Sequence, residues 1–325
     1  MFRKKINILV ITPTNHITGL NKELNKIGNV KFIEDPTYKQ VKKIIKNYDG
    51  LFTNPNKSKV CLDKNLLKLA IRLKVICTAS TGTNHIDMKY AKKNKIKILC
   101  LKEDRSTINK ISSTAEHAFA LTLSSIRNII SSNQSVLNNE WDYTRFIGRQ
   151  LNNLTFGIIG YGRLGKLYAN YLRPFKANIL VYDPYKKVNN KYVKQVNKID
   201  YLLKASDVIS LHVHLNNETN KIINKKKFNK MKKNVIIINT ARGEIVNDKD
   251  LIYFLTNNKD AKYATDVLSN ELSNIKNNSI IKFAKKSSQV LITPHIGGMT
   301  KEAQEIAFNH SAKKLSCFFT DFFIA

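Results

Sequence analysis

The 325-residue chain has few acidic residues. Aspartate and glutamate number 24 against 55 lysines and arginines, which gives a formal net charge of +31. Such an excess is typical of proteins that bind polyanions. Here, however, the lysines are spread along the whole chain together with many asparagines. We therefore interpret the charge as a compositional bias and expect no specific nucleic-acid partner.

Cysteines are also few, and no long hydrophobic run is present. The four cysteines are scattered, with neither a C-x-x-C pair nor the spacing of metal ligands, so we expect no metal site. Cys77 and Cys100 lie in or beside apolar runs, as small buried residues do in a reducing compartment. The basic start of the chain precedes only a short apolar stretch, too short for a signal peptide or a membrane span. These absences predict a cytoplasmic protein without membrane attachment.

The strongest local signal is a glycine motif between two apolar runs. Residues 156–159 are typical of a buried parallel strand, and residues 160–165 have the spacing G-x-G-x-x-G that opens a helix. The glycines allow a tight turn, a pyrophosphate against bare backbone and close packing of helix on strand. The next apolar run ends on Asp183, where a carboxylate would accept the ribose hydroxyls of NAD. The stretch predicts a dinucleotide site.

The rest of the chain alternates apolar runs with amphipathic stretches. We predict strands in the first hundred residues at 6–11, 30–33, 51–53, 75–77 and 96–99. After Asp183 we predict strands at 208–213, 235–238, 263–267 and 290–292, and a last helix at 300–319. This rhythm predicts an α/β fold with two doubly wound parallel-sheet domains.

One long helix is expected between these halves. Residues 115–130 are rich in apolar side chains, and Ser112 or Ser113 is the expected N-cap. The apolar surface is wide for a single packing face, which favours burial between domains or subunits.

Two sets of polar residues stand where an open α/β sheet binds ligands. Asp183, His212, Arg242, Asp266 and His295 all lie at or just past predicted strand ends, which converge on one crevice. Taken singly, Arg242 could equally form a surface ion pair and His295 could be a satisfied loop histidine. The loop at 78–87 offers backbone N–H groups to an anion, or is simply a polar turn.

Taken together, the motifs resemble those of the D-isomer-specific 2-hydroxyacid dehydrogenase family, which includes phosphoglycerate dehydrogenases and glyoxylate/hydroxypyruvate reductases. The matches, in family order, are GTNHID at 82–87, AEHA at 115–118, GYGRLG at 160–165, SDV at 206–208, NTARG at 239–243, DV at 266–267 with Glu271, and TPHIGG at 293–298. The resemblance implies an NAD-dependent oxidoreductase that interconverts a D-2-hydroxy acid and its 2-oxo acid. A corepressor-like protein that senses NAD(H) without catalysis is the alternative within the family.

The resemblance also implies the domains and the assembly. A flavodoxin-like substrate domain would comprise residues 1–108 and 295–325, and an inserted Rossmann NAD domain would comprise residues 109–294. Family members pair through the region of residues 115–130, so a homodimer is expected. We expect no appended effector domain, because 30 residues follow His295.

The resemblance finally implies roles for individual residues. His295 would be the acid/base, Glu271 would hydrogen-bond its other ring nitrogen, and Arg242 would bind the substrate carboxylate and polarise the carbonyl. Backbone N–H groups near Ser80, Thr81 and Gly82 would hold the carboxylate as well. The residues implied in NAD binding are Gly160, Tyr161, Gly162, Arg163, Leu164, Gly165, Asp183, His212, Thr240, Ala241, Asp266 and Gly298.

Overall fold

A computed structural model of the chain describes residues 6–55, 60–271 and 275–324 and divides the chain into two compact units. The first unit comprises Met1–Ile111 and Met299–Ala325, and the second comprises Ser112–Gly298. The second unit is thus an insertion in the first. The sequence predicts boundaries after residues 108 and 294, whereas the two units divide after residues 111 and 298. Residues 109–111 thus belong to the first unit and residues 295–298 to the second.

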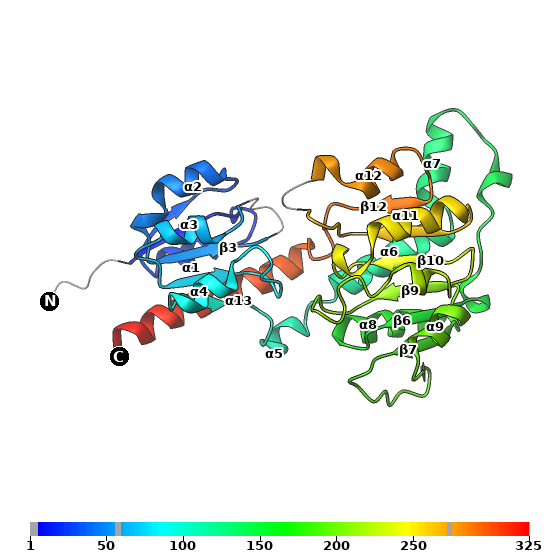
Figure 1. Cartoon of the computed structure of the whole chain (residues 1–325). Coiled ribbons are helices and arrows are strands. Elements are labelled where there is room, and N and C mark those ends of the chain that lie inside the picture. The colour runs from blue at the N-terminus through cyan, green and yellow to red at the C-terminus, as the bar shows by residue number, and fades with distance from the viewer. Residues whose placement is uncertain (1–5, 56–59, 272–274, 325) are drawn as a thin grey trace. The chain divides into compact units, whose positions relative to one another are not determined.

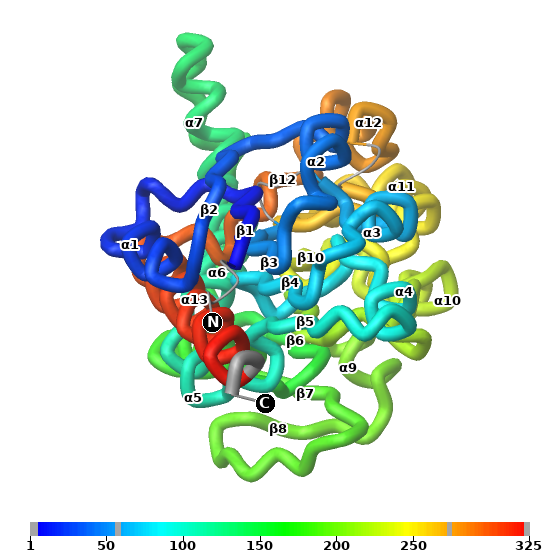
Figure 2. Tube along the Cα trace, turned by 90° about the vertical axis from the view of Figure 1, so that its left-hand side faces the viewer, coloured from blue at the N-terminus to red at the C-terminus, as the bar shows by residue number. Residues whose placement is uncertain are grey.

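The first unit is built on a five-stranded parallel sheet in the order β2-β1-β3-β4-β5 (Figure 2). The strands are β1 (Asn7–Val10), β2 (Asn29–Phe32), β3 (Gly50–Thr53), β4 (Val75–Thr78) and β5 (Lys97–Leu99). Each lies within one residue, at either end, of the strand predicted from the sequence. The strand order is that of flavodoxin-like sheets, as expected.

Helices cover both faces of this sheet. They are α1 (Leu20–Asn25), α2 (Tyr38–Ile44), α3 (Lys64–Leu69), α4 (Met88–Lys93), α5 (Arg105–Ile108) and α13 (Lys301–Ile324), with a 3-10 turn at Ile45–Asn47. One apolar cluster joins Ile8 and Phe52 of the sheet to α1 and to Phe308 of α13. The other joins Leu9 and Leu51 to α2, α3 and α4. Neighbouring strand residues thus serve opposite faces, and α13 completes the core of the first unit.

The second unit contains a seven-stranded parallel sheet in the order β12-β11-β10-β9-β6-β7-β8. The strands are β6 (Thr155–Ile159), β7 (Asn178–Tyr182), β8 (Lys194–Gln195), β9 (Val208–Leu211), β10 (Ile236–Asn239), β11 (Lys262–Thr265) and β12 (Val290–Ile292). The order from β8 to β11 is that of the Rossmann sheet, extended by β12. The strand predicted at 263–267 ends at Thr265, so Asp266 lies just beyond it rather than within it.

Helices also cover both faces of the second sheet. They are α6 (Ser113–Ile126), α7 (Ile129–Leu137), α8 (Arg163–Leu172), α9 (Ile199–Ala205), α10 (Lys225–Phe228), α11 (Asp248–Asn257) and α12 (Ser279–Ala284). Short 3-10 turns lie at Tyr143–Phe146, Leu151–Asn153, Arg173–Phe175, Gly243–Ile245 and Ile275–Asn277. Phe156 and Ile158 of β6 pack with α6 and α8, whereas Ile159 packs with α9 and α11 on the opposite face.

The single helix predicted at 115–130 is two helices. Asn128 has φ 57°, in the left-handed region, and this separates α6 from α7. Ser112 occupies the N-cap position, but its side chain makes no capping hydrogen bond. α6 buries Ala118, Leu121 and Ile126 in the core of its own unit. The uncovered apolar surface lies instead on α7, which projects from its unit in both views (Figures 1 and 2).

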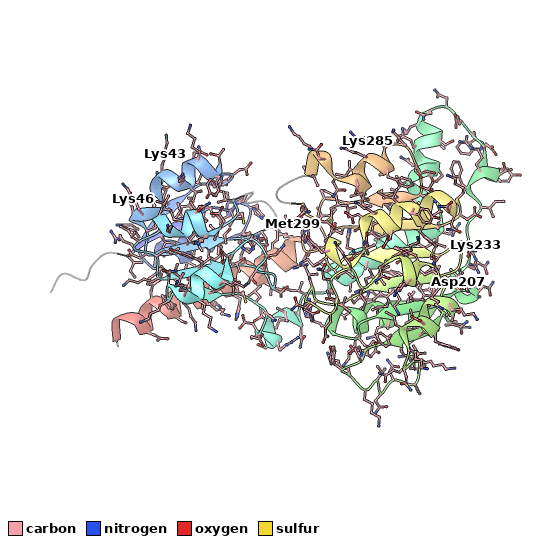
Figure 3. The ribbon with its side chains drawn as sticks, in the orientation of Figure 1. Lys43, Lys46, Asp207, Lys233, Lys285 and Met299 are labelled. Carbon is pink, nitrogen blue, oxygen red and sulfur yellow. The ribbon has the colours of Figure 1, made fainter. Side chains whose placement is uncertain are left out.

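The basic side chains mostly face solvent. Lys43 and Lys46 point outward from the surface of the first unit (Figure 3). Two basic side chains instead pair with Asp207, the residue just before β9 that is labelled in Figure 3. Its carboxylate pairs with Arg149 and Lys232 and accepts the N–H of Thr155. Burial opposes these contacts, but together they hold the pKa of Asp207 below its ordinary value. The motif SDV therefore has a structural explanation in the second sheet.

Candidate active site

The glycine motif forms the turn between β6 and α8. Gly160 has φ 93°, and a Cβ there would lie 2.6 Å from the carbonyl oxygen of His212. A Cβ on Gly165 would lie 2.1 Å from the oxygen of Gly160, so glycine is required for this close packing. Gly162 is the N-cap of α8, and a Cβ there would meet no protein atom within 4 Å. The turn is therefore tight where it meets protein and open in front of the helix, which fits a bound pyrophosphate.

Asp183 fixes the neighbouring strand end to this turn. One carboxylate oxygen accepts the N–H of Tyr161 at 2.8 Å, and the other accepts the N–H of Tyr185 at 3.0 Å. Each oxygen keeps a lone pair for a hydroxyl donor. Tyr161 itself is buried, with its hydroxyl held by Asn190, so its contribution at this turn is made by its backbone.

The side chain of His212 points into the protein. Its Nε2 lies 2.8 Å from the hydroxyl of Ser210, and its ring lies against that of Tyr168, with centroids 5.1 Å apart. Burial lowers the pKa of His212 to about 4, so the imidazole is neutral at physiological pH. The group that faces the glycine turn is the backbone carbonyl of His212.

Asn239, the last residue of β10, shapes the turn that carries Arg242. Its side-chain oxygen accepts the N–H of Ala241, and its amide nitrogen donates to the carbonyl of Arg242. The Arg242 guanidinium donates to the carbonyl of Ala241 at 2.6 Å and is partly exposed. Thr240 is buried at the base of the same turn. The turn therefore places a partly accessible guanidinium just beyond a strand end.

Gly243 joins this turn to the segment that leads to Glu271. A Cβ on Gly243 would lie 2.1 Å from backbone atoms of both Leu268 and Ser269. No larger residue fits without moving one of the two backbones. The position of Arg242 relative to the following segment is thus fixed by backbone contact.

His295 and Glu271 form a close imidazole–carboxylate pair. His295 Nδ1 lies 2.7 Å from Glu271 Oε1, and both side chains are about one-fifth to one-quarter exposed. Glu271 also accepts the N–H of Leu268. With the carboxylate at Nδ1, the ring is oriented and Nε2 is left to exchange a proton with a ligand.

The backbone of His295 is in an unfavourable conformation. Its φ is 57°, in the left-handed region that non-glycine residues seldom occupy. Such a conformation costs on the order of 1–3 kcal/mol and persists only where the surroundings impose it. The contacts of the residues on either side of His295 therefore matter to the geometry of the pair.

Asp266 supplies contacts on both sides of His295. Its carboxylate accepts the hydroxyl of Thr293 at 2.6 Å and the N–H groups of Ile296 and Gly297 at 2.8 and 2.7 Å. His117 Nε2, on α6, lies 2.8 Å from Thr293 Oγ1 and 3.3 Å from Asp266 Oδ1. Burial alone would raise the pKa of Asp266, but these hydrogen bonds outweigh it and lower the pKa.

The other residues implied by the resemblance lie as follows. Gly298 ends the second unit, and a Cβ there would meet no atom within 4 Å. In the first unit, the loop after β4 bends so that the Ser80 hydroxyl donates to the carbonyl of Gly82 at 2.6 Å. Thr81 is exposed in the same loop. The assignment of Ser80, Thr81 and Gly82 to substrate binding stays a prediction.

The sequence motifs contain His117, Asn239 and Gly243 but predict no role for them. These residues contact either side chains far away in the sequence or backbone atoms, so the spacing of residues in the sequence does not reveal their roles. Within residues 6–55, 60–271 and 275–324, no cluster of three His, Cys, Asp or Glu could hold a metal ion. Nor does any helix in these ranges have the length and apolar character needed to cross a membrane.

Comparison with known proteins identifies the family. Residues 119–297 match the model of the D-isomer specific 2-hydroxyacid dehydrogenase, NAD binding domain. The chain is 34% identical to D-3-phosphoglycerate dehydrogenase of Methanocaldococcus jannaschii, over 93% of the chain and 55% of that protein. It is 33% identical to hydroxypyruvate reductase of Thermotoga maritima, over 88% of each.

A similar solved structure is that of D-lactate dehydrogenase from Aquifex aeolicus complexed with NAD and lactic acid, with a TM-score of 0.81 and 28% identity over 97% of this chain and 96% of that one. The chain spans about half the length of the curated phosphoglycerate dehydrogenases that it matches. The family model, the relatives and the shared fold agree. The chain belongs to the D-isomer specific 2-hydroxyacid dehydrogenase family.

Proposed function

We propose that the protein is an NAD-dependent oxidoreductase that interconverts a D-2-hydroxy acid and the corresponding 2-oxo acid. The observation that carries this proposal is the His295–Glu271 pair, at 2.7 Å, beyond the strand ends of a sheet whose first turn is a dinucleotide-type glycine turn. Neither part alone would suffice, because glycine turns also occur in proteins that only bind dinucleotides. The pair adds an oriented acid/base group.

In this proposal the protein's own residues position the substrate and move one proton. The Arg242 guanidinium binds the carboxylate of the acid and polarises the adjacent oxygen, for which its planar fork of donors is suited. His295 Nε2 accepts the proton of the hydroxyl in oxidation and returns it to the carbonyl oxygen in reduction. Glu271 stabilises the imidazolium that forms, and NAD, when bound, supplies the hydride acceptor.

The residues around the glycine turn fit this cofactor. The open space at Gly162 leaves the N-terminus of α8 accessible to phosphate, and Asp183 is held in place by two backbone N–H groups. We propose that Asp183 binds the adenosine ribose hydroxyls, with backbone contacts from residues 160–165. Thr240, Ala241, Asp266 and Gly298 remain proposed contacts at the nicotinamide side, and His212 would contribute through its backbone.

NAD should be used in preference to NADP. The Asp183 carboxylate cannot turn away from a 2′-phosphate without giving up the N–H groups of Tyr161 and Tyr185. We expect kcat/KM to be at least about tenfold higher with NAD, since each tenfold needs only about 1.4 kcal/mol of repulsion. Steady-state assays with both cofactors measure this. Asp183→Ser should narrow the preference; equal kcat/KM in the unmodified protein would mean that the exposed Lys186 and Lys187 neutralise the phosphate.

The acid itself is best identified by a substrate panel. The relatives act, by their names, on 3-phosphoglycerate, hydroxypyruvate and lactate. We propose an acid of this class, bound through its carboxylate. Oxidation of NADH should be followed with glyoxylate, pyruvate, hydroxypyruvate and its phosphate at one enzyme concentration. We expect turnover of at least one of these acids; NADH binding without any turnover would favour the sensing alternative.

We further propose a homodimer that buries the exposed apolar side chains of α7 and the segment after it. Leu137, Trp141 and Ile147 are each more than two-thirds exposed. Covering such a surface is the usual result of a two-fold interface. Light scattering at low micromolar concentration should give twice the 37.2 kDa of one chain. The double variant Leu137→Glu/Trp141→Ser should be monomeric and the control Tyr201→Ser dimeric; a monomeric unmodified protein would refute the proposal.

We also propose that the protein is located in the cytoplasm. All four cysteines are free, including the exposed Cys61 and Cys317. Exposed thiols persist in a reducing compartment. Cys77 is buried, which raises the pKa of its thiol to about 12 and makes it unreactive.

A further inference from the structure

The loop that carries His295 is held from two sides by contacts that lie outside the His295–Glu271 pair. Before His295, Thr293 is fixed twice: its N–H donates to the carbonyl of Thr265, and its hydroxyl donates to Asp266. After His295, the N–H groups of Ile296 and Gly297 donate to the same carboxylate. Asp266 thus holds both ends of the left-handed turn at His295.

The number of hydrogens on each group decides which group donates in the hydrogen bonds around Asp266. A hydroxyl has one hydrogen, and that of Thr293 is given to the carboxylate at 2.6 Å. The contact of 2.8 Å between His117 Nε2 and Thr293 Oγ1 must then be donated by the histidine. A chain runs from His117 through Thr293 to Asp266, and the 3.3 Å contact between His117 and Asp266 closes it.

Packing leaves little freedom in this arrangement. Asp266 is 2% exposed, so its carboxylate relies on these donors in place of water. A Cβ on Gly297 would lie 3.0 Å from Asp266 Oδ2 and 3.3 Å from Thr114 Cγ2, so the loop fits closely between Asp266 and the start of α6. His117 and Thr114 both belong to the first turns of α6, and of the two His117 forms the hydrogen bond to the loop.

We propose that His117, Thr293 and Asp266 are positioning residues that hold the loop of His295 in its left-handed conformation and so align the ring with Glu271. The expected effect on kcat rests on the proposed dehydrogenase function. The hydrogen bonds that anchor the loop do not depend on that function. His117 connects the first helix of the second unit to the loop of the acid/base. Neither His117 nor Thr293 needs to touch the substrate for this role.

A double-mutant cycle tests the chain of hydrogen bonds. His117→Leu and Thr293→Val should each lower kcat about tenfold. His117→Leu removes the hydrogen bond to Thr293, and Thr293→Val removes both that bond and the one to Asp266. The KM of the acid and the Kd of NADH should stay within about twofold, since neither residue binds them. The double variant should be about tenfold slower, not about a hundredfold, because the two residues act in series. His117→Gln, whose amide can donate from the same place, should restore most of the rate.

Hydrogen exchange of residues 293–298 tests the anchor without any turnover. In His117→Leu and Thr293→Val the amides of Ile296 and Gly297 should exchange about tenfold faster, because the carboxylate that holds them is loosened. The matched control is Thr122→Val, which removes a buried hydroxyl bonded to Tyr168 elsewhere on α6 and should leave this loop unchanged.

The outcomes separate the two proposals. If the two variants exchange faster but the unmodified protein turns over no 2-oxo acid, the result would support the anchor and contradict the proposed function. Unchanged exchange in both variants would overturn the anchor whatever the activity. A double variant slower by about a hundredfold, or a glutamine variant no better than the leucine variant, would overturn the relay through Thr293. Thr293→Val is nearly isosteric, so it keeps the test available if His117→Leu does not fold.

Discussion

Replacement of His295 by asparagine should lower kcat by about 10² to 10⁴, the usual contribution of a positioned acid/base group. Asparagine removes the proton acceptor that the substrate hydroxyl would use. It is also one of the few residues that tolerate the φ of 57° found at this position, so the backbone of the loop should survive. Steady-state kinetics in both directions measure the loss.

Binding of NADH serves as the control for this variant. Fluorescence titration should give a Kd for NADH within about twofold of that of the unmodified protein, because the glycine turn and Asp183 are unchanged. A tenfold change in Kd would need a loss of about 1.4 kcal/mol of binding free energy. Near-normal turnover of His295→Asn would show that another group accepts the proton. The pairing with Glu271 would then be only structural.

Replacement of Arg242 by glutamine should lower kcat/KM by roughly 10² to 10³, the range found when one strong donor to a developing oxyanion is removed. Glutamine keeps an amide donor but loses the charge and the two-pronged geometry. The turn itself should persist, since Asn239 holds it through the backbone of Ala241 and Arg242. The loss should appear in both KM and kcat, because the carboxylate is bound before and during the reaction.

A second arginine provides the matched control. Arg72, in the first unit, is partly exposed and pairs with Asp49 at 2.9 Å. Arg72→Gln removes the same charge and should leave kcat/KM unchanged within about twofold, since partly exposed ion pairs contribute little. If both variants lose activity equally, net charge rather than substrate binding would explain the effect of Arg242→Gln.

Much of the fold could be predicted from periodicity because most strands are apolar runs flanked by polar segments. The five strands of the first sheet illustrate this. The two-residue β8 could not be found, since Lys194 and Gln195 show no such pattern. The break at Asn128 was also missed, because it depends on one left-handed backbone angle rather than on hydrophobicity.

The candidate site was predictable only in part. Strand ends converge, so Asp183, Arg242 and Asp266 could be expected near one edge of the sheet. The pairing of His295 with Glu271 came from the family resemblance, because residues 24 positions apart leave no periodic signal. The contact between His117 and Thr293 spans 176 positions and was invisible for the same reason. Side-chain direction separates His212, which points inward, from residues that can meet a ligand.

The most direct test of the proposed function follows the hydride itself. The unmodified protein should be incubated with NADH deuterated at the transferable position of C4 and with the 2-oxo acid that it turns over fastest. We predict a D-2-hydroxy acid with one deuterium at C2, detected by chiral chromatography and mass spectrometry, and almost none of it with His295→Asn. An unlabelled product, an L-hydroxy acid, or NADH binding without any product would contradict it.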